Sequence, residues 1–269
     1  MMTGKDHAPV LMSEVSDIEE TRNIQWKRNL SADAPLRWLS RGWKDLWISP
    51  VPSLLYGLLV FVASIVFIAY MFDTGRDYFL FPALAGFLIV GPIIASGLYL
   101  KSRSIELGEP FSLRTMVAVR PKAGAQVFFT GMLLVMLILL WMRAAVLVYA
   151  LFFGIQPFPG LDQVANMLVT TPTGWAMLAV GGFIGSLFAG FAFAISVFSI
   201  PMLLDRRIDA FTAMGISTTM VWNNLRVTLT WGAIVLALFL ASLATGLLGL
   251  IVIFPWLGHA TWHAYREMR

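Results

Sequence analysis

The chain has 269 residues, of which 58% are hydrophobic and only 13% are charged. Soluble globular domains carry about 25% charged residues, so this composition favours an integral membrane protein whose main partner is the lipid bilayer. The absence of cysteine excludes disulfides, iron–sulfur clusters and a cysteine nucleophile. The net charge of +4 does not indicate nucleic-acid binding, because every Lys and Arg except Arg76 and Arg143 lies at a terminus or on alternate connections between apolar runs.

Residues 1–34 are polar, carry charges of both signs and lack the apolar core of a cleavable signal peptide. We expect a mobile cytoplasmic tail there. From Leu36 onward, Trp38, Trp43 and Trp47 recur among leucines, with Arg and Lys between them. This pattern predicts an amphipathic helix in the headgroup plane, with the tryptophans together on its membrane-facing side.

Six apolar runs follow, each with about the 20 residues that cross a hydrocarbon core. The last two runs are separated only by Thr245-Gly246, so one long tilted helix or a re-entrant pair is the alternative there. With six spans the basic connections share one side, which predicts that both termini are cytoplasmic. The expected fold is an all-α polytopic transmembrane helical bundle of six spans, with amphipathic interfacial helices before the odd-numbered spans. The predicted spans are 51–72, 79–100, 125–153, 173–204, 227–245 and 246–264.

Weaker amphipathic stretches also precede the third span, at 111–119, and the fifth span, at 211–222. Sliding the chain against itself by 100 residues brings Phe111 onto Phe211. This similarity indicates three units, each an interfacial helix followed by a hairpin. The alternative is that any cytoplasmic connection of a membrane protein looks amphipathic. After the tail, the six-helix domain 35–269 is therefore divided into the units 35–100, 105–204 and 208–265.

The fourth predicted span carries small residues at every fourth position: Gly182, Ser186 and Gly190. Such a row lets another helix approach closely. The approaching helix would belong either to the same bundle or to a second protomer.

Arg143 is the only charge well inside a predicted span. An ionisable residue at that depth costs several kcal/mol unless it is satisfied, which makes it a candidate anion or lipid-headgroup site. It also lies only about 15 Å, at 1.5 Å per residue, from the predicted outer end at Gly154. A long guanidinium side chain can reach toward the interface over much of that distance, which is the structural alternative.

His259 and His263 are four residues apart, so they share one helical face. That spacing could hold a metal ion or haem, but the surrounding aromatic and basic residues are also typical of a membrane interface. The sequence contains no phosphate-binding loop, no Ser-His-Asp set and no paired transmembrane carboxylates. We therefore expect no catalytic residue, no metal and no other cofactor.

Three segments carry a family resemblance: PLRWLSRGWKDLWISPVPSLLYGL (35–58), EPFSL (109–113) and FPWLGHATWHAYRE (254–267). They resemble recurrent segments of a bacterial family of integral membrane proteins of unknown function, some members of which carry a cytochrome c oxidase subunit label. The resemblance covers residues 22–268 and implies six helices and a bacterial inner-membrane location. A catalytic oxidase subunit is excluded, because its haem and copper ligands need more than the 3 histidines of this chain.

We expect a non-enzymatic accessory or scaffold protein of the inner membrane, with a respiratory complex as a candidate partner and a homo-oligomer as the alternative. A carrier or lipid-handling protein with a cavity near Arg143 is the first rival. Haem or metal binding through His259 and His263 is the second.

Overall fold

The computed structural model describes residues 30–119, 122–154 and 161–269, so most of the predicted tail lies outside the described residues. The described elements are all helices, which confirms the all-α prediction. In chain order they are α2 (Ala34–Trp47), α3 (Pro50–Asp73), η1 (Asp77–Phe79), α4 (Leu80–Ile94), α5 (Ser96–Leu107), α6 (Leu113–Val117), α7 (Gly124–Phe153), α8 (Leu161–Thr170), α9 (Pro172–Ser196), α10 (Ser199–Asp205), α11 (Ala210–Asn223), α12 (Leu225–Ala244) and α13 (Leu250–Met268).

Within the described part of the chain, 4 helices are long and apolar enough to cross a membrane: α3, α7, α9 continued by α10, and α12. They correspond to the first, third, fourth and fifth predicted spans. The second predicted span is interrupted, because α4 ends at Ile94 and α5 begins at Ser96. Pro92 lies in the last turn of α4, where its missing backbone N–H weakens the helix. The count of six spans therefore stays a prediction.

Residues 227–264 form two helices, not one long helix. The chain reverses at Gly246 and Leu247, which both adopt positive φ (62° and 69°). The Leu247 amide donates to the Ser242 carbonyl at 2.8 Å, and the Gly249 amide donates to Thr245 Oγ1 at 2.9 Å. The predicted turn at Thr245-Gly246 is thus confirmed, while the number of times this pair crosses the bilayer stays a prediction.

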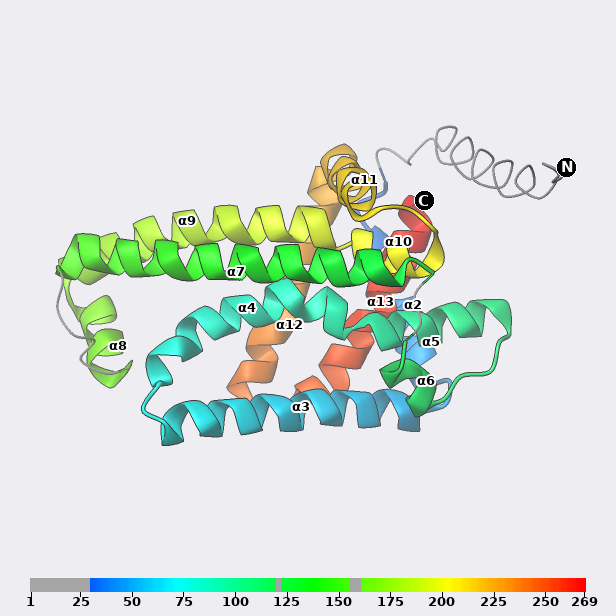
Figure 1. Ribbon diagram of the computed structural model, residues 1–269, viewed down its shortest axis with the longest axis horizontal. Coiled ribbons are helices and arrows are strands. Elements are labelled where there is room, and N and C mark those ends of the chain that lie inside the picture. Colours follow the sequence, from blue (N-terminus) through cyan, green and yellow to red (C-terminus); the bar gives the residue numbers. More distant parts are fainter. Residues whose placement is uncertain (1–29, 120–121, 155–160) are drawn as a thin grey trace, which may run out of the picture.

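The long helices form layers (Figure 1). In that view α3 lies along one edge, α7 and α9 lie side by side along the other, and α4 lies between them. A Cβ on Gly86 would lie 3.6 Å from Ile138, and a Cβ on Gly131 would lie 3.3 Å from Ile93, so α4 runs antiparallel to α7. α7 and α9 extend past the end of α3 on the side away from the C-terminus.

The core is centred on α13, which α2, α3 and α5 surround. Gly42 of α2 lies so close that a Cβ there would be 2.5 Å from the backbone nitrogen of Ala260. Gly57 of α3 similarly faces the carbonyl of Ile251. Close backbone approach at both crossings explains why these positions need glycine. Helix α13, predicted as a span, is therefore largely enclosed by protein.

Helices also occupy the positions of the three predicted interfacial stretches, as α2, α6 and α11. Their location at the membrane surface, and the three-unit division of the chain, stay predictions.

Candidate functional sites

The three tryptophans of α2 do not share one environment. Trp38 is fully buried, with its indole Nε1 donating to Glu267 at 3.2 Å and its ring edge-on to Trp231. Trp43 and Trp47 remain 39% and 54% exposed and pack edge-to-face on each other. The prediction of one shared membrane-facing side is wrong for Trp38. Five residues of helix rotate Trp38 by about 140° from Trp43, which directs it into the protein.

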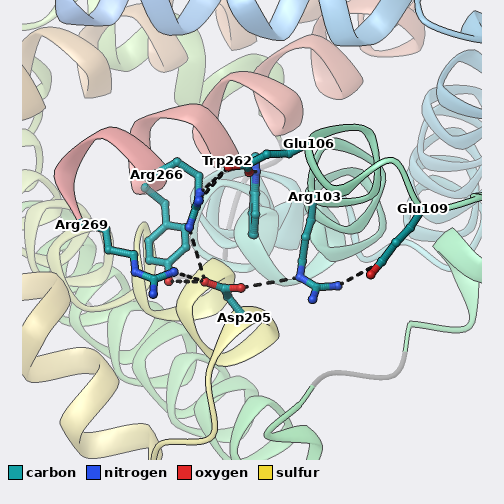
Figure 2. Close-up of polar contacts among 8 residues, drawn as sticks. Arg103, Glu106, Glu109, Asp205, Trp262, Arg266 and Arg269 are labelled. Atoms are coloured by element: carbon teal, nitrogen blue, oxygen red, sulfur yellow. Dashed lines mark hydrogen bonds and ion pairs between the residues drawn. The ribbon is translucent and has the colours of Figure 1, made fainter. Parts of the chain in front are cut away.

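Asp205, at the end of α10, is the centre of an ionic network that joins α5, α10 and α13 (Figure 2). Its Oδ2 accepts hydrogen bonds from Tyr265 at 3.1 Å and from Arg269 at 2.8 Å, and its Oδ1 lies 3.6 Å from Arg103 Nε. One carboxylate therefore balances charges from two other helices.

Two more carboxylates complete this charged end of the molecule. Glu106 of α5 accepts from Arg266 Nη2 at 2.7 Å and from Trp262 Nε1 at 3.2 Å, as Figure 2 shows. Glu267 of α13 accepts from Arg37 Nη2 at 2.5 Å and so connects α2 to the end of the chain. Sequence reasoning missed these acidic residues, although their placement among basic residues at helix ends was a usable signal.

A chain of buried hydrogen bonds begins at Lys101, whose side chain is completely buried. Its Nζ donates to the carbonyl of Ser49 at 2.9 Å and to Ser53 Oγ at 2.8 Å, and it lies over the ring of Phe111. Because the ammonium can only donate, the Ser53 hydroxyl is free to donate onward to His259 Nε2, 2.9 Å away. Burial lowers the pKa of Lys101 to about 8, although the charge of Asp45 opposes the shift.

The buried hydrogen bonds continue from His259 to Ser102 of α5, and the neighbouring His263 bonds to Asp45 of α2. With Nε2 of the neutral His259 ring as the acceptor from Ser53, its Nδ1 is the donor to Ser102 Oγ, 2.8 Å away, and His263 Nε2 bonds to Asp45 Oδ2 at 2.8 Å. Burial by itself would raise the pKa of Asp45, but hydrogen bonds from His263 and Ser102 outweigh it and hold that pKa below its ordinary value.

This geometry bears directly on the histidine pair. Both ring nitrogens of His259 are occupied by serine hydroxyls, and the ring is completely buried. His259 therefore offers no free nitrogen to a metal ion or haem iron. The pair instead connects α13 with α2, α3 and α5 through hydrogen bonds.

Arg143 is exposed, and its guanidinium forms no hydrogen bond or ion pair with any described residue. It borders an open groove of about 1260 Å³ formed by α7, α9, α11 and the end of η1. The contacts Gly86–Ile138 and Ile93–Gly131 set a register that brings Arg143 level with the first turn of α4. That turn follows the polar connection after α3, so Arg143 lies near one end of the apolar helices.

The length of α7 explains this position. Its 30 residues extend about 45 Å at 1.5 Å per residue, whereas the hydrocarbon core is about 30 Å thick. The helix must tilt or protrude, and it does extend past α3 (Figure 1). The register therefore does not support the expectation of a charge deep inside a span.

The small-residue row of α9 is open. A Cβ at Gly182 or Gly190 would meet no atom within 4 Å, and Ser186 between them is exposed. The neighbouring row makes the packing contact instead, because a Cβ on Gly185 would lie 3.0 Å from the Trp141 ring of α7. The open glycines border a cavity of about 630 Å³ between α4, α9, α12 and α13.

Comparison with known proteins gives one match. Residues 80–205, from α4 to α10, match the model of a family described as "Predicted integral membrane protein (DUF2189)". The chain matches no curated protein and no solved structure. The matched segment contains Arg143 and the open row of α9, but neither α2 nor α13. The resemblance inferred from the sequence is thus confirmed: over α4 to α10 this chain matches a family of integral membrane proteins of unknown function.

Proposed function

We propose that the protein is a non-enzymatic accessory or scaffold protein of the bacterial inner membrane, and that it binds a transmembrane helix of another membrane protein on α9. The observation that carries this proposal is the open row of Gly182, Ser186 and Gly190, which no described side chain covers. Without side chains in the way, two helix backbones approach closely and gain van der Waals contact and weak hydrogen bonds.

The charged end supports the proposal, because its ionic contacts attach the C-terminal end of α9 to the rest of the protein. α9 continues into α10, and α10 ends at Asp205, which bonds to Tyr265 and Arg269 of the α13 end. Helix α9 is therefore attached to the core at one end, while its small-residue row remains available to a partner.

A crosslinking experiment tests this function. A photo-crosslinking residue in place of Ser186 should join the protein to one stoichiometric partner, whereas the same residue in place of Leu147, an exposed position of α7, should not. Gly182→Leu should abolish the crosslink, because the leucine side chain prevents close approach. Gly215→Leu on α11, which also meets nothing within 4 Å, is the matched control and should retain it. A crosslink that survives Gly182→Leu contradicts the docking site, and a crosslink only to a second copy of the chain replaces the scaffold with a homo-oligomer.

We assign the charged end, with both termini, to the cytoplasm. An ion pair at 2.5 Å joins Arg37 and Glu267, which supports an even number of crossings between them. Basic residues gather at this end, in accordance with the positive-inside rule. A fluorescent-protein fusion after Arg269 should be active, and an alkaline phosphatase fusion there should be inactive. Phosphatase activity would contradict the assignment.

Lipid handling is a second candidate function, favoured by the groove beside Arg143. Its test is transfer of a fluorescent phospholipid between vesicles in the presence of the purified protein. Transfer no faster than in vesicles without protein would exclude it.

A further inference from the structure

We infer that the groove along α7 binds one anionic phospholipid, with its phosphate on Arg143 and its acyl chains against the apolar walls. This inference rests on the same groove as the lipid-handling candidate and names its ligand. It does not require that the lipid be moved.

The shape of the groove fits the apolar part of a lipid. On α7 it extends from Leu133 to Val146, which is about 20 Å at 1.5 Å per residue, slightly more than half the thickness of a hydrocarbon core of about 30 Å. Leu140, Phe191 and Met214 contribute side chains from three helices. The groove therefore offers a continuous apolar surface about as long as one leaflet is deep.

The charge of the groove determines the headgroup. Among the described residues that line it, only Arg143 is charged, and it lies near the level where the apolar helices end. A guanidinium at the end of an apolar groove attracts an anion, and its planar fork suits two phosphate oxygens. No described residue of the lining carries a carboxylate to receive the ammonium of a zwitterionic headgroup. A phospholipid with net negative charge is thus the complementary occupant.

The residues at the other end of the groove indicate the direction in which the acyl chains extend. There the lining is supplied by α11, where Thr218 is a polar but uncharged residue and its hydroxyl is already bonded to the carbonyl of Met214 at 2.9 Å. Phe211 of α11 packs edge-on to Phe129 of α7 at 5.4 Å. The acyl chains therefore extend from Arg143 toward α11.

Native mass spectrometry of the full chain tests the inference. Protein reconstituted with equal amounts of phosphatidylglycerol and phosphatidylcholine of the same acyl chains should retain one phosphatidylglycerol after detergent washing. Arg143→Met should retain about tenfold less, as expected for loss of a charge-assisted hydrogen bond, and Arg143→Lys should fall between them. Arg76→Met, which removes an exposed arginine outside the groove, should behave as wild type.

A second variant keeps the charge and fills the groove. Leu140→Trp should also lose phosphatidylglycerol, because the larger side chain occupies the acyl path. Equal retention of both lipids, or full retention in Arg143→Met or Leu140→Trp, would overturn the inference. Binding of inorganic phosphate alone at the same affinity would overturn it too, since the apolar walls would then contribute nothing. One bound lipid without transfer between vesicles supports the inference and contradicts the lipid-handling function. Transfer without a retained lipid supports the lipid-handling function and contradicts the inference.

Discussion

Glycines in two regions of the molecule have opposite surroundings. Where α2 crosses α13, a Cβ on Gly42 would lie 2.5 Å from the backbone of Ala260, so the chain itself occupies the space that the glycine leaves. On α9, Gly182 and Gly190 leave the same kind of space, and no described residue fills it. The difference is that the charged end completes its own packing, whereas no described residue covers these positions of α9.

Charged residues show the same contrast. At the charged end, Asp205 and Glu267 each bond to several donors from other parts of the chain. On α7, Arg143 has no such partner among the described residues. Stability should therefore depend on the charged end, and ligand binding on the open faces of α7 and α9. Three substitutions and one change of pH test this division.

The largest effect is expected for Asp205→Ala. The change leaves the charges of Arg103 and Arg269 without their shared acceptor, which should lower the free energy of unfolding by about 3 to 4 kcal/mol. Thermal unfolding in mild detergent measures it. Glu109→Gln is the control, because the Glu109 carboxylate is exposed and lies 3.5 Å from Arg103, so this pair should contribute little. Equal melting temperatures for the two variants would show that the network is not a main source of stability.

Gly42→Ala should come next, with a loss of about 2 to 3 kcal/mol. The added methyl group meets backbone atoms of Ala260, which cannot move without separating α2 from α13. Ser40→Ala, at an exposed position of the same helix, should unfold as wild type does. A Gly42→Ala protein as stable as that control would mean that α2 is only loosely attached.

Lys101 should make stability rise between pH 8 and pH 10. Burial lowers its pKa from 10.5 to about 8, so in this range the unfolded chain binds a proton that the folded chain has released. Stability increases with pH wherever the unfolded state holds more protons, here by about 1 to 2 kcal/mol. The expected observation is that the melting temperature of the wild type rises from pH 8 to pH 10 relative to that of Lys101→Met, since the raised pKa of Tyr265 lowers stability toward pH 10 in both proteins. Identical pH profiles for the wild type and Lys101→Met would show that Lys101 keeps an ordinary pKa.

Gly182→Ala should have almost no effect on the isolated protein, within about 0.5 kcal/mol, because its Cβ meets nothing within 4 Å. The comparison with Gly42→Ala is direct, since both changes add one methyl group to a helical glycine. A loss as large as that of Gly42→Ala would remove the distinction between the two regions, because it would place an undetected neighbour of the same chain on α9.

Some features of the candidate sites depend on contacts between residues that are far apart in the sequence, which no local sequence pattern predicts. In the sequence, Lys101 looks like any other basic residue on a connection between apolar runs. Its hydrogen-bond partners Ser49 and Ser53, however, lie 52 and 48 residues away along the chain. Trp38 resembles Trp43 in its surroundings along the chain, but α2 directs it toward Trp231 of α12. The histidine pair was found from its spacing, whereas its hydrogen-bond role requires α2, α3 and α5 to meet at α13.

The sequence by itself determined the helical class, the membrane environment, the four long apolar helices and the reversal at Thr245-Gly246. These are local properties, because the length of an apolar run and the residues of a turn act through the nearest part of the chain and the surrounding solvent. Only the tertiary structure decided which face of each helix is covered. That depends on the rotation and register of helices distant in sequence, so the burial of Lys101, the balance of charges at Asp205 and the openness of Gly182 follow from the packing alone.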